Sequence, residues 1–300
     1  MTSSPLWAMI LAGGEGLRLR SFTRSIAGDD RPKQFCPVLG DETLLERTRR
    51  RAALLTGPDR TTIVLTRAHE RFYAPLVTDV PARCRVVQPE NRGTAPAILY
   101  GLFRIAVVAP MATVVILPCD HYVSDEIRFA RHVGQAHAAV DRRPDIVALL
   151  GVFASSAEPD YGWIEPGEPL PGSPLRRVGR FWEKPTEDLA RILLQRGCLW
   201  NTLVIVARVP TLLAMIRIVS RQLHEPFAAV PAVIGTLAER AAVERVYGLL
   251  APACFSATVL AAKPANLTVL PVAGVEWSDL GNPQRVMATL ADPAARLGTR

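Results

Sequence analysis

The first 150 residues alternate short apolar runs with longer amphipathic segments, and this alternation limits the folds open to the chain. The apolar runs predict β-strands at residues 6–12, 61–66, 85–88, 113–117 and 146–152. The intervening segments predict helices at residues 43–55, 69–77, 94–108 and 125–140. Ser124 is the expected N-cap of the last helix, and Gly57 the stop after the first. Such alternation favours an α/β fold with a mostly parallel, Rossmann-like sheet that has helices on both faces.

The second half of the chain is less regular. Strands are predicted at residues 161–165, 177–183, 199–207 and 266–272, with a helix at 186–196 and helical material from 208 to about 250. We interpret this half as the completion of one mixed sheet plus a small substrate-facing lobe. The expected organisation is a single domain over residues 1–290, with halves at 1–150 and 151–290, followed by a short tail at 291–300.

A glycine-rich loop follows the first predicted strand and carries the strongest functional signal. Gly13, Gly14 and Gly16 let backbone N–H groups approach an anion, and Arg18 and Lys33 add positive charge. This chemistry is typical of a polyphosphate-binding loop, although a tight turn after an edge strand is the alternative for the loop taken alone. The loop also lies at the carboxyl end of a strand, where ligands of parallel sheets collect.

Two commoner glycine-rich loops fit this segment badly. A Walker loop requires Gly-Lys-Ser/Thr, whereas Lys33 lies between Pro32 and Gln34. A dinucleotide fingerprint requires a third glycine, where this chain has Leu19. Gly28, Pro32 and Pro37 are helix breakers, so no helix is expected to begin promptly after the loop.

The charge pattern favours a small anionic ligand over a nucleic acid. The net charge is +7, and among 35 basic residues only Lys33, Lys184 and Lys263 are lysines. The arginines are scattered and not interleaved with stacking aromatics, so a solvated surface plus a phosphate site explains them better than nucleic acid does. Because a compact ammonium differs from a guanidinium, Lys33 and Lys184 are candidates for specific roles.

The cysteine spacing and the hydropathy pattern indicate in which cellular compartment the protein is expected. The five cysteines show no metal-site or disulfide spacing, which fits a reducing cytosol and predicts a cytoplasmic protein. No signal-peptide pattern is visible, and residues 98–119 are split by Gly101 and Pro110, so no membrane association is expected.

Five segments, in order, resemble the sugar-1-phosphate nucleotidyltransferases, in particular the mannose-1-phosphate guanylyltransferase branch. They are LAGGEGLRLR with RPKQF, QPENRGTAPA, PCDH, YGWIEPGE with WEKP, and WNT with EWSDLG. The resemblance implies a nucleotidyltransferase (GT-A-like) fold with a nucleotide-binding half and a sugar-phosphate-binding half. The implied reaction joins a hexose 1-phosphate, most consistent with mannose 1-phosphate, to an NTP, most consistent with GTP, and releases pyrophosphate. The implied partners are these small molecules, and a homo-oligomer is left open.

The resemblance also implies roles for individual residues. Arg18 and Lys33 would be catalytic, and Gly13, Gly14, Gly16, Gln88, Asn91, Gly93 and Thr94 would bind the nucleotide. A simple capped turn is the alternative for the segment around Asn91. Gly162, Glu183, Lys184 and Asn201 would bind the sugar phosphate, and Asp120 and Asp279 would hold Mg²⁺ as cofactor.

The chain departs from the family pattern beside the sugar site. Thr202-Leu203 replaces the usual Ser-Gly, and Ser256-Ala257-Thr258 lacks the usual carboxylate. Residues 25–30 form an insertion that we expect to lengthen the phosphate loop. Two alternatives therefore stay open: the same chemistry with another NTP or hexose 1-phosphate, or a nucleotide-binding regulatory paralogue with weakened turnover.

Overall fold

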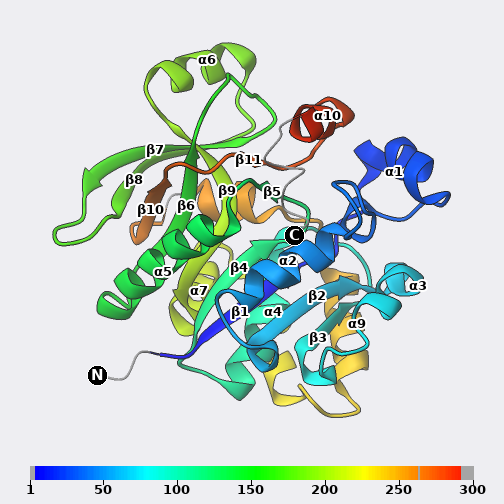
Figure 1. The fold of residues 1–300 in the computed structure, drawn as a ribbon. Coiled ribbons are helices and arrows are strands. Elements are labelled where there is room, and N and C mark those ends of the chain that lie inside the picture. The colour runs from blue at the N-terminus through cyan, green and yellow to red at the C-terminus, as the bar shows by residue number, and fades with distance from the viewer. Residues whose placement is uncertain (1–3, 263, 292–300) are drawn as a thin grey trace.

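A nine-stranded sheet forms the centre of the molecule in the computed structural model, which describes residues 4–262 and 264–291 (Figure 1). The strand order is β3-β2-β1-β4-β9-β6-β10-β8-β7. The bounds are β1 Leu6–Leu11, β2 Thr61–Thr66, β3 Arg85–Gln88, β4 Thr113–Pro118, β6 Val147–Phe153, β7 Gly162–Pro169, β8 Arg176–Glu183, β9 Leu199–Arg208 and β10 Leu267–Val272. A separate antiparallel pair joins β5 (Tyr122–Val123) to β11 (Trp277–Ser278).

The sheet is mixed, which confirms the expected fold class. β1 is parallel to both β2 and β4, and β2 is parallel to β3. β9 then runs antiparallel between β4 and β6, while β10 is parallel to β6. β8 and β7 extend the sheet in antiparallel fashion, and β7 also pairs with the start of β9, so this end of the sheet curls back on itself.

Helices cover both faces of the sheet (Figure 1). Their bounds are α1 Arg20–Ala27, α2 Leu44–Ala53, α3 Glu70–Tyr73, α4 Thr94–Val108, α5 Glu126–Arg142, α6 Glu187–Gln195, α7 Val209–Val219, α8 Arg221–His224, α9 Glu239–Leu249 and α10 Pro283–Ala291. Successive residues of β1 point to opposite faces, so Met9 packs in the core beneath α4 and Ile10 in the core beneath α2 and α5. This two-sided burial explains why the strand is a continuous apolar run.

Local capping signals fix several helix starts. Thr43 and Glu46 form a capping box at the start of α2, and the Thr186 side chain caps α6 by accepting from the N–H of Leu189. The predicted cap of α5 was wrong by one residue, because the Asp125 carboxylate accepts from the N–H of Arg128. The Ser124 hydroxyl instead accepts from the N–H of Glu276, which ties this turn to the approach to β11.

Two sequence-based expectations about helices were wrong. A short 3₁₀ turn and then α1 begin directly after the glycine-rich loop, because Gly28 ends α1 with a φ of 76° and both prolines come later. The residues of the proposed insertion therefore complete α1 and the turn after it. The segment 69–77 is not one helix: Pro75 interrupts it, and only α3 is α-helical between two 3₁₀ turns.

Residues 98–119 form most of α4, a short connecting turn and β4. Their apolar side chains lie largely in the core, except around the turn, where Val107, Val108 and Met111 are exposed. Within the two described ranges, no helix combines the length and the apolar composition that crossing a lipid bilayer requires.

Candidate active site

One cleft of about 370 Å³ brings together residues from across the chain. It opens at the carboxyl ends of β1, β3 and β4 and is closed on its far side by residues of β7, β8 and β9. All predicted site residues except Gly16 and Lys33 line this cleft. Gly16 and Lys33 line an adjoining hollow of about 300 Å³ that shares Arg18 and Asp120 with the cleft.

The glycine-rich loop is braced from beneath by two buried side chains. The Gln34 amide donates to the carbonyls of Ala12 (3.1 Å) and Gly14 (2.7 Å), and the Thr66 hydroxyl donates to the carbonyl of Gly13 (3.0 Å). These bonds engage carbonyl groups, whose partial negative charge would otherwise repel an anion bound at the loop. A Cβ at Gly13 would lie 2.7 Å from Nε2 of Gln88 and 2.8 Å from Oγ1 of Thr66, so a larger residue there would have to displace these two side chains.

The segment from Gln88 to Thr94, predicted to bind the nucleotide, contains a capped turn and lines the cleft. The Asn91 side chain accepts from the N–H of Gly93 (2.9 Å), and the Thr94 hydroxyl accepts from the N–H of Phe255 (2.8 Å). Gln88 is almost fully buried, and its Oε1 accepts from the Tyr247 hydroxyl (2.9 Å). The alternative of a capped turn is thus present in the structure, and the same residues line the cleft.

Lys33 ties the two predicted metal-binding segments together. Its ammonium lies 3.1 Å from Oδ2 of Asp120 and donates to the backbone carbonyls of Asp279 (2.6 Å) and Leu280 (3.1 Å). Burial alone would raise the pKa of Asp120, but Lys33 and, less strongly, His121 outweigh it, so the pKa lies below its ordinary value. The carboxylate of Asp120 is therefore ionised at neutral pH.

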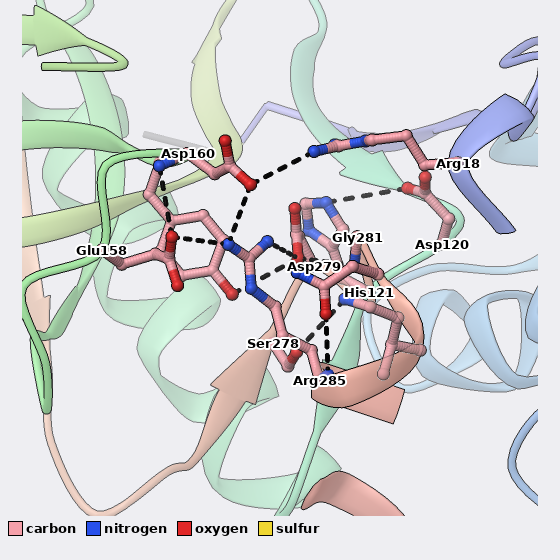
Figure 2. A network of polar contacts seen from close by, with 12 residues as sticks. Arg18, Asp120, His121, Glu158, Asp160, Ser278, Asp279, Gly281 and Arg285 are labelled. Atoms are coloured by element: carbon pink, nitrogen blue, oxygen red, sulfur yellow. Dashed lines mark hydrogen bonds and ion pairs between the residues drawn. The ribbon is translucent and has the colours of Figure 1, made fainter. Parts of the chain in front are cut away.

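Three donors hold the carboxylate of Asp279, and two of them, Gly281 and Arg285, are labelled in Figure 2. Its Oδ1 accepts from the N–H of Gly281 (2.7 Å), from Nη1 of Arg285 (2.9 Å) and from the Tyr161 hydroxyl (3.3 Å). Burial raises the pKa of Tyr161, and the Asp279 charge raises it further, so this phenol remains a donor.

The predicted sugar-phosphate residues gather at the opposite wall. Gly162 pairs with Glu183 across β7 and β8, and a Cβ on Gly162 would lie 3.0 Å from Oε2 of Glu183 and 3.2 Å from Cβ of Asn201. Burial raises the pKa of Glu183, and neighbouring Lys184 partly offsets this effect. The Asn201 amide is oriented at both ends, by the N–H of Leu203 (3.1 Å) and by Ser256 Oγ (3.4 Å).

Sequence reasoning missed several contributors to this site, among them Gln34, Tyr161, Asp160 and Arg285. Gln34 lies inside the quoted RPKQF segment, and Tyr161 begins the YGW segment, so both were within reach of the motif argument. Asp160 precedes that segment by one residue and forms ion pairs with Arg18 (3.4 Å) and Arg285 (3.3 Å). Arg285 follows the EWSDLG segment by four residues and stands in no motif.

The fold and the cleft define an α/β protein in which a glycine-rich loop and a polar wall formed by residues of β7, β8 and β9 line one cleft. Residues 7–293 match the sequence model of the nucleotidyl transferase family. The chain belongs to this family of enzymes.

The sequence is also similar to curated bacterial proteins. It is 30% identical over 222 residues to the mannose-1-phosphate guanylyltransferase RfbM of Salmonella typhimurium, covering 72% of this chain and 45% of that protein. It is 30% identical over 199 residues to the alginate biosynthesis protein AlgA of Pseudomonas aeruginosa, covering 65% of this chain and 40% of that protein. The match therefore spans less than half the length of these relatives.

Solved structures share the fold. A Thermus thermophilus protein described as a mannose-1-phosphate geranyltransferase superposes with a TM-score of 0.81 at 28% identity, over 94% of this chain and 79% of that one. A Helicobacter pylori protein described as a mannose-6-phosphate isomerase gives a TM-score of 0.70 at 17% identity, over 91% of this chain and 99% of that one. At that identity the second likeness concerns the fold alone.

Proposed function

We propose that this protein transfers GMP from GTP to mannose 1-phosphate, giving GDP-mannose and pyrophosphate. The observation that carries the proposal is that one cleft is lined by the glycine-rich loop, by Glu183, Lys184 and Asn201, and by two aspartates, Asp120 and Asp279. The guanylyltransferase name of the Salmonella relative supports the choice of substrates.

The reaction needs no covalent intermediate on the protein. A phosphate oxygen of the sugar 1-phosphate attacks the α-phosphorus in line, and the bond to the bridging oxygen of pyrophosphate breaks. Catalysis of this kind rests on positioning and charge neutralisation. The amides of Gly13, Gly14 and Gly16 would cradle the triphosphate, and Arg18 would neutralise the leaving pyrophosphate.

On the acceptor side, Lys184 would pair with the sugar phosphate. Glu183 and Asn201 would bond sugar hydroxyls, and Gly162 leaves room for the sugar to approach them. On the donor side, the segment from Gln88 to Thr94 would receive the base.

Lys33 would contribute in two ways. Its three donors already hold Asp120 and the carbonyls of Asp279 and Leu280, which keeps the two acidic segments together. Contact with the reacting phosphates, the role implied by the family resemblance, would require the ammonium to exchange at least one of these acceptors for a phosphate oxygen.

Asp120 and Asp279 fit a Mg²⁺ ion as its protein ligands. In the described part of the chain, no three His, Cys, Asp or Glu side chains gather as a metal site. The proposed protein ligands are the two hard carboxylates of Asp120 and Asp279. Mg²⁺ commonly takes one or two carboxylates and completes its shell with phosphate oxygens and water. Bound there, the ion would neutralise charge on the reacting phosphates.

Leu203 favours a test of other hexoses as well. It lines the cleft beside Asn201 and adopts a φ of 55°, a left-handed conformation that non-glycine residues seldom occupy. It lies in a bulge, because Leu150 alone faces the three residues between Asn201 and Ile205. Nucleotidyl transfer to a different hexose 1-phosphate is therefore the second candidate function.

A substrate grid tests both candidates. The purified protein is incubated with Mg²⁺, each of five NTPs and several hexose 1-phosphates, and pyrophosphate release and sugar-nucleotide formation are measured. The proposal predicts the highest kcat/KM for GTP with mannose 1-phosphate. Preferred turnover of another combination of NTP and hexose 1-phosphate would select the second candidate. Binding of substrates with no product from any combination would indicate the regulatory paralogue.

A further inference from the structure

Arg285, on α10, gathers carboxylates from two loops that lie far apart in the sequence. Its guanidinium contacts Asp279 (2.9 Å), Glu158 (2.7 Å) and Asp160 (3.3 Å), as Figure 2 shows. Its side chain is only 12% exposed. We infer that Arg285 is a positioning residue for nucleotidyl transfer, which acts by holding Asp279 and Asp160 in place; this inference rests on the proposed function.

The contact with Asp279 fixes the orientation of that carboxylate. The three described hydrogen bonds of the carboxylate, from Arg285, Gly281 and Tyr161, all end on Oδ1. The side chain is thus anchored through one oxygen, so Oδ2 is the oxygen left to meet a cation in the cleft. Arg285 lines the cavity behind Tyr161 and not the cleft itself, so it works through Asp279 and does not touch substrate.

A guanidinium suits this place better than an ammonium. It is planar, carries five N–H donors and can serve acceptors on two edges at once. Its central carbon also lies 4.4 Å from the centre of the Tyr161 ring, a stacking contact that orients the plane. The same tyrosine donates to Asp279, so ring, guanidinium and carboxylate support one another.

The network also reaches the phosphate loop. Oδ2 of Asp160 accepts from Nη2 of Arg285 (3.3 Å) and from Nη1 of Arg18 (3.4 Å). Arg285 therefore anchors the carboxylate that steadies Arg18 from across the cleft. One buried arginine connects the acidic segment around Asp279 with the cation expected to face pyrophosphate.

A pair of variants tests the inference. Arg285→Ala should lower kcat about 10–100-fold, the usual effect of removing a partner that orients a ligand, and should change KM for GTP less than threefold. Arg221→Ala is the matched control, because Arg221 is 82% exposed and pairs only with Glu225 among its described contacts. It should keep wild-type kcat.

Hydrogen exchange supplies a readout that does not depend on activity. The Gly281 N–H is bonded to Asp279 Oδ1, so an unanchored carboxylate should let this amide exchange faster. Peptides covering residues 276–284 should exchange faster in Arg285→Ala than in wild type or Arg221→Ala. Unchanged exchange, or faster exchange with wild-type kcat, would overturn the inference.

A double-variant cycle shows whether Arg285 acts through Asp279. Adding Arg285→Ala to Asp279→Asn should lower kcat less than about threefold further, because coupled residues are not additive. Fully additive losses would contradict the inference. If Arg285→Ala does not fold, Arg285→Lys replaces it and should also exchange faster, since a compact ammonium lacks the planar, two-edged array of donors with which the guanidinium meets Asp279 and the Glu158–Asp160 loop together. If wild type turns over no substrate pair, the proposed function fails, and exchange alone decides whether Arg285 holds Asp279.

Discussion

The ammonium of Lys33 lies 3.1 Å from Oδ2 of Asp120, and this pair joins the segment after the glycine-rich loop to the end of β4. The Lys33 side chain is 9% exposed and that of Asp120 34% exposed, so the lysine is the more deeply desolvated partner. Removing one member of such a pair leaves a poorly solvated charge behind, which costs far more than the loss of a surface ion pair. The pair is therefore a sensitive point of the site.

Lys33→Ala should lower kcat/KM for GTP at least about 100-fold, because it removes a preorganised positive charge at the reacting phosphates. Lys33→Arg should not restore activity, since a planar guanidinium cannot replace a compact ammonium among three acceptors. Lys184→Ala is the contrasting variant and should raise KM mainly for the sugar phosphate. Steady-state kinetics with each substrate varied separates these outcomes; wild-type turnover in Lys33→Ala would refute the proposed role.

Two glycine substitutions should separate binding from folding. A Cβ on Gly14 meets no atom within 4 Å, so Gly14→Ala should change the free energy of unfolding by less than about 0.5 kcal/mol. Its methyl group should nonetheless obstruct the phosphate cradle and raise KM for GTP.

Gly93 has a φ of 88°, and its Cβ would lie 2.4 Å from the carbonyl of Ala253. Gly93→Ala should therefore cost more than about 2 kcal/mol of stability. Chemical denaturation gives the free energy of unfolding of Gly14→Ala and Gly93→Ala, and steady-state kinetics gives their KM for GTP. If Gly14→Ala and Gly93→Ala lost the same free energy of unfolding, the described difference between the backbone at Gly14 and at Gly93 would be contradicted.

Arg18 should matter for activity and little for stability. Its ion pair with Asp160 joins side chains that are 55% and 45% exposed, and such pairs contribute at most about 1 kcal/mol. Arg18→Ala should thus change the free energy of unfolding by less than about 1 kcal/mol while reducing kcat about 100-fold. Asp160→Asn weakens the same ion pair but retains Arg18, so its kcat should fall much less. Equal losses of kcat would mean that the ion pair, and not the Arg18 charge, serves the reaction.

Glu183 should make stability depend on pH. Burial raises its pKa in the folded protein above the ordinary value of 4.5, although Lys184 partly opposes the shift. The folded state therefore binds the proton of the Glu183 carboxyl more tightly than the unfolded state does. The contribution of this protonated carboxyl to the free energy of unfolding is fully present below pH 4.5 and is lost as the pH rises through the pKa of the folded state. Glu183→Gln should consequently gain stability relative to wild type between about pH 4 and pH 7. Denaturant unfolding at both pH values measures this gain, and Glu168→Gln, at an exposed glutamate, is the control. If the stability difference between Glu183→Gln and wild type did not change with pH, the raised pKa of Glu183 would be contradicted.

The sequence predicted the parallel core because its signals there are local and agree with one another. β1 to β4 are apolar runs with glycines, prolines or polar residues at their ends, and both faces of the sheet are covered. α1 was missed because Gly28 and Pro32 were interpreted as breakers of a helix, whereas Gly28 is the residue that ends one. The helix at 69–77 failed because Pro75 had been given too little weight.

At the site, motifs located the residues that line the cleft but not those that hold them. Asp160 contacts Arg285 and Arg18 across separations of 125 and 142 residues, and neither periodicity nor spacing reveals such contacts. Arg285 was further obscured by an arginine-rich composition. Only the folded chain shows that this arginine, unlike the exposed ones, is buried against three carboxylates.

The most direct test of the central claim follows the α-phosphate itself. GTP labelled at the α-phosphorus is incubated with mannose 1-phosphate and Mg²⁺, and the labelled products and pyrophosphate are quantified for wild type and Asp120→Asn. Nucleotidyl transfer at this cleft predicts that labelled GDP-mannose and unlabelled pyrophosphate form in equal amounts, and only when both substrates are present. In Asp120→Asn, product formation should be at least about 100-fold slower. Label that remains in GTP or appears as free GMP, or equal rates in the two proteins, would contradict it.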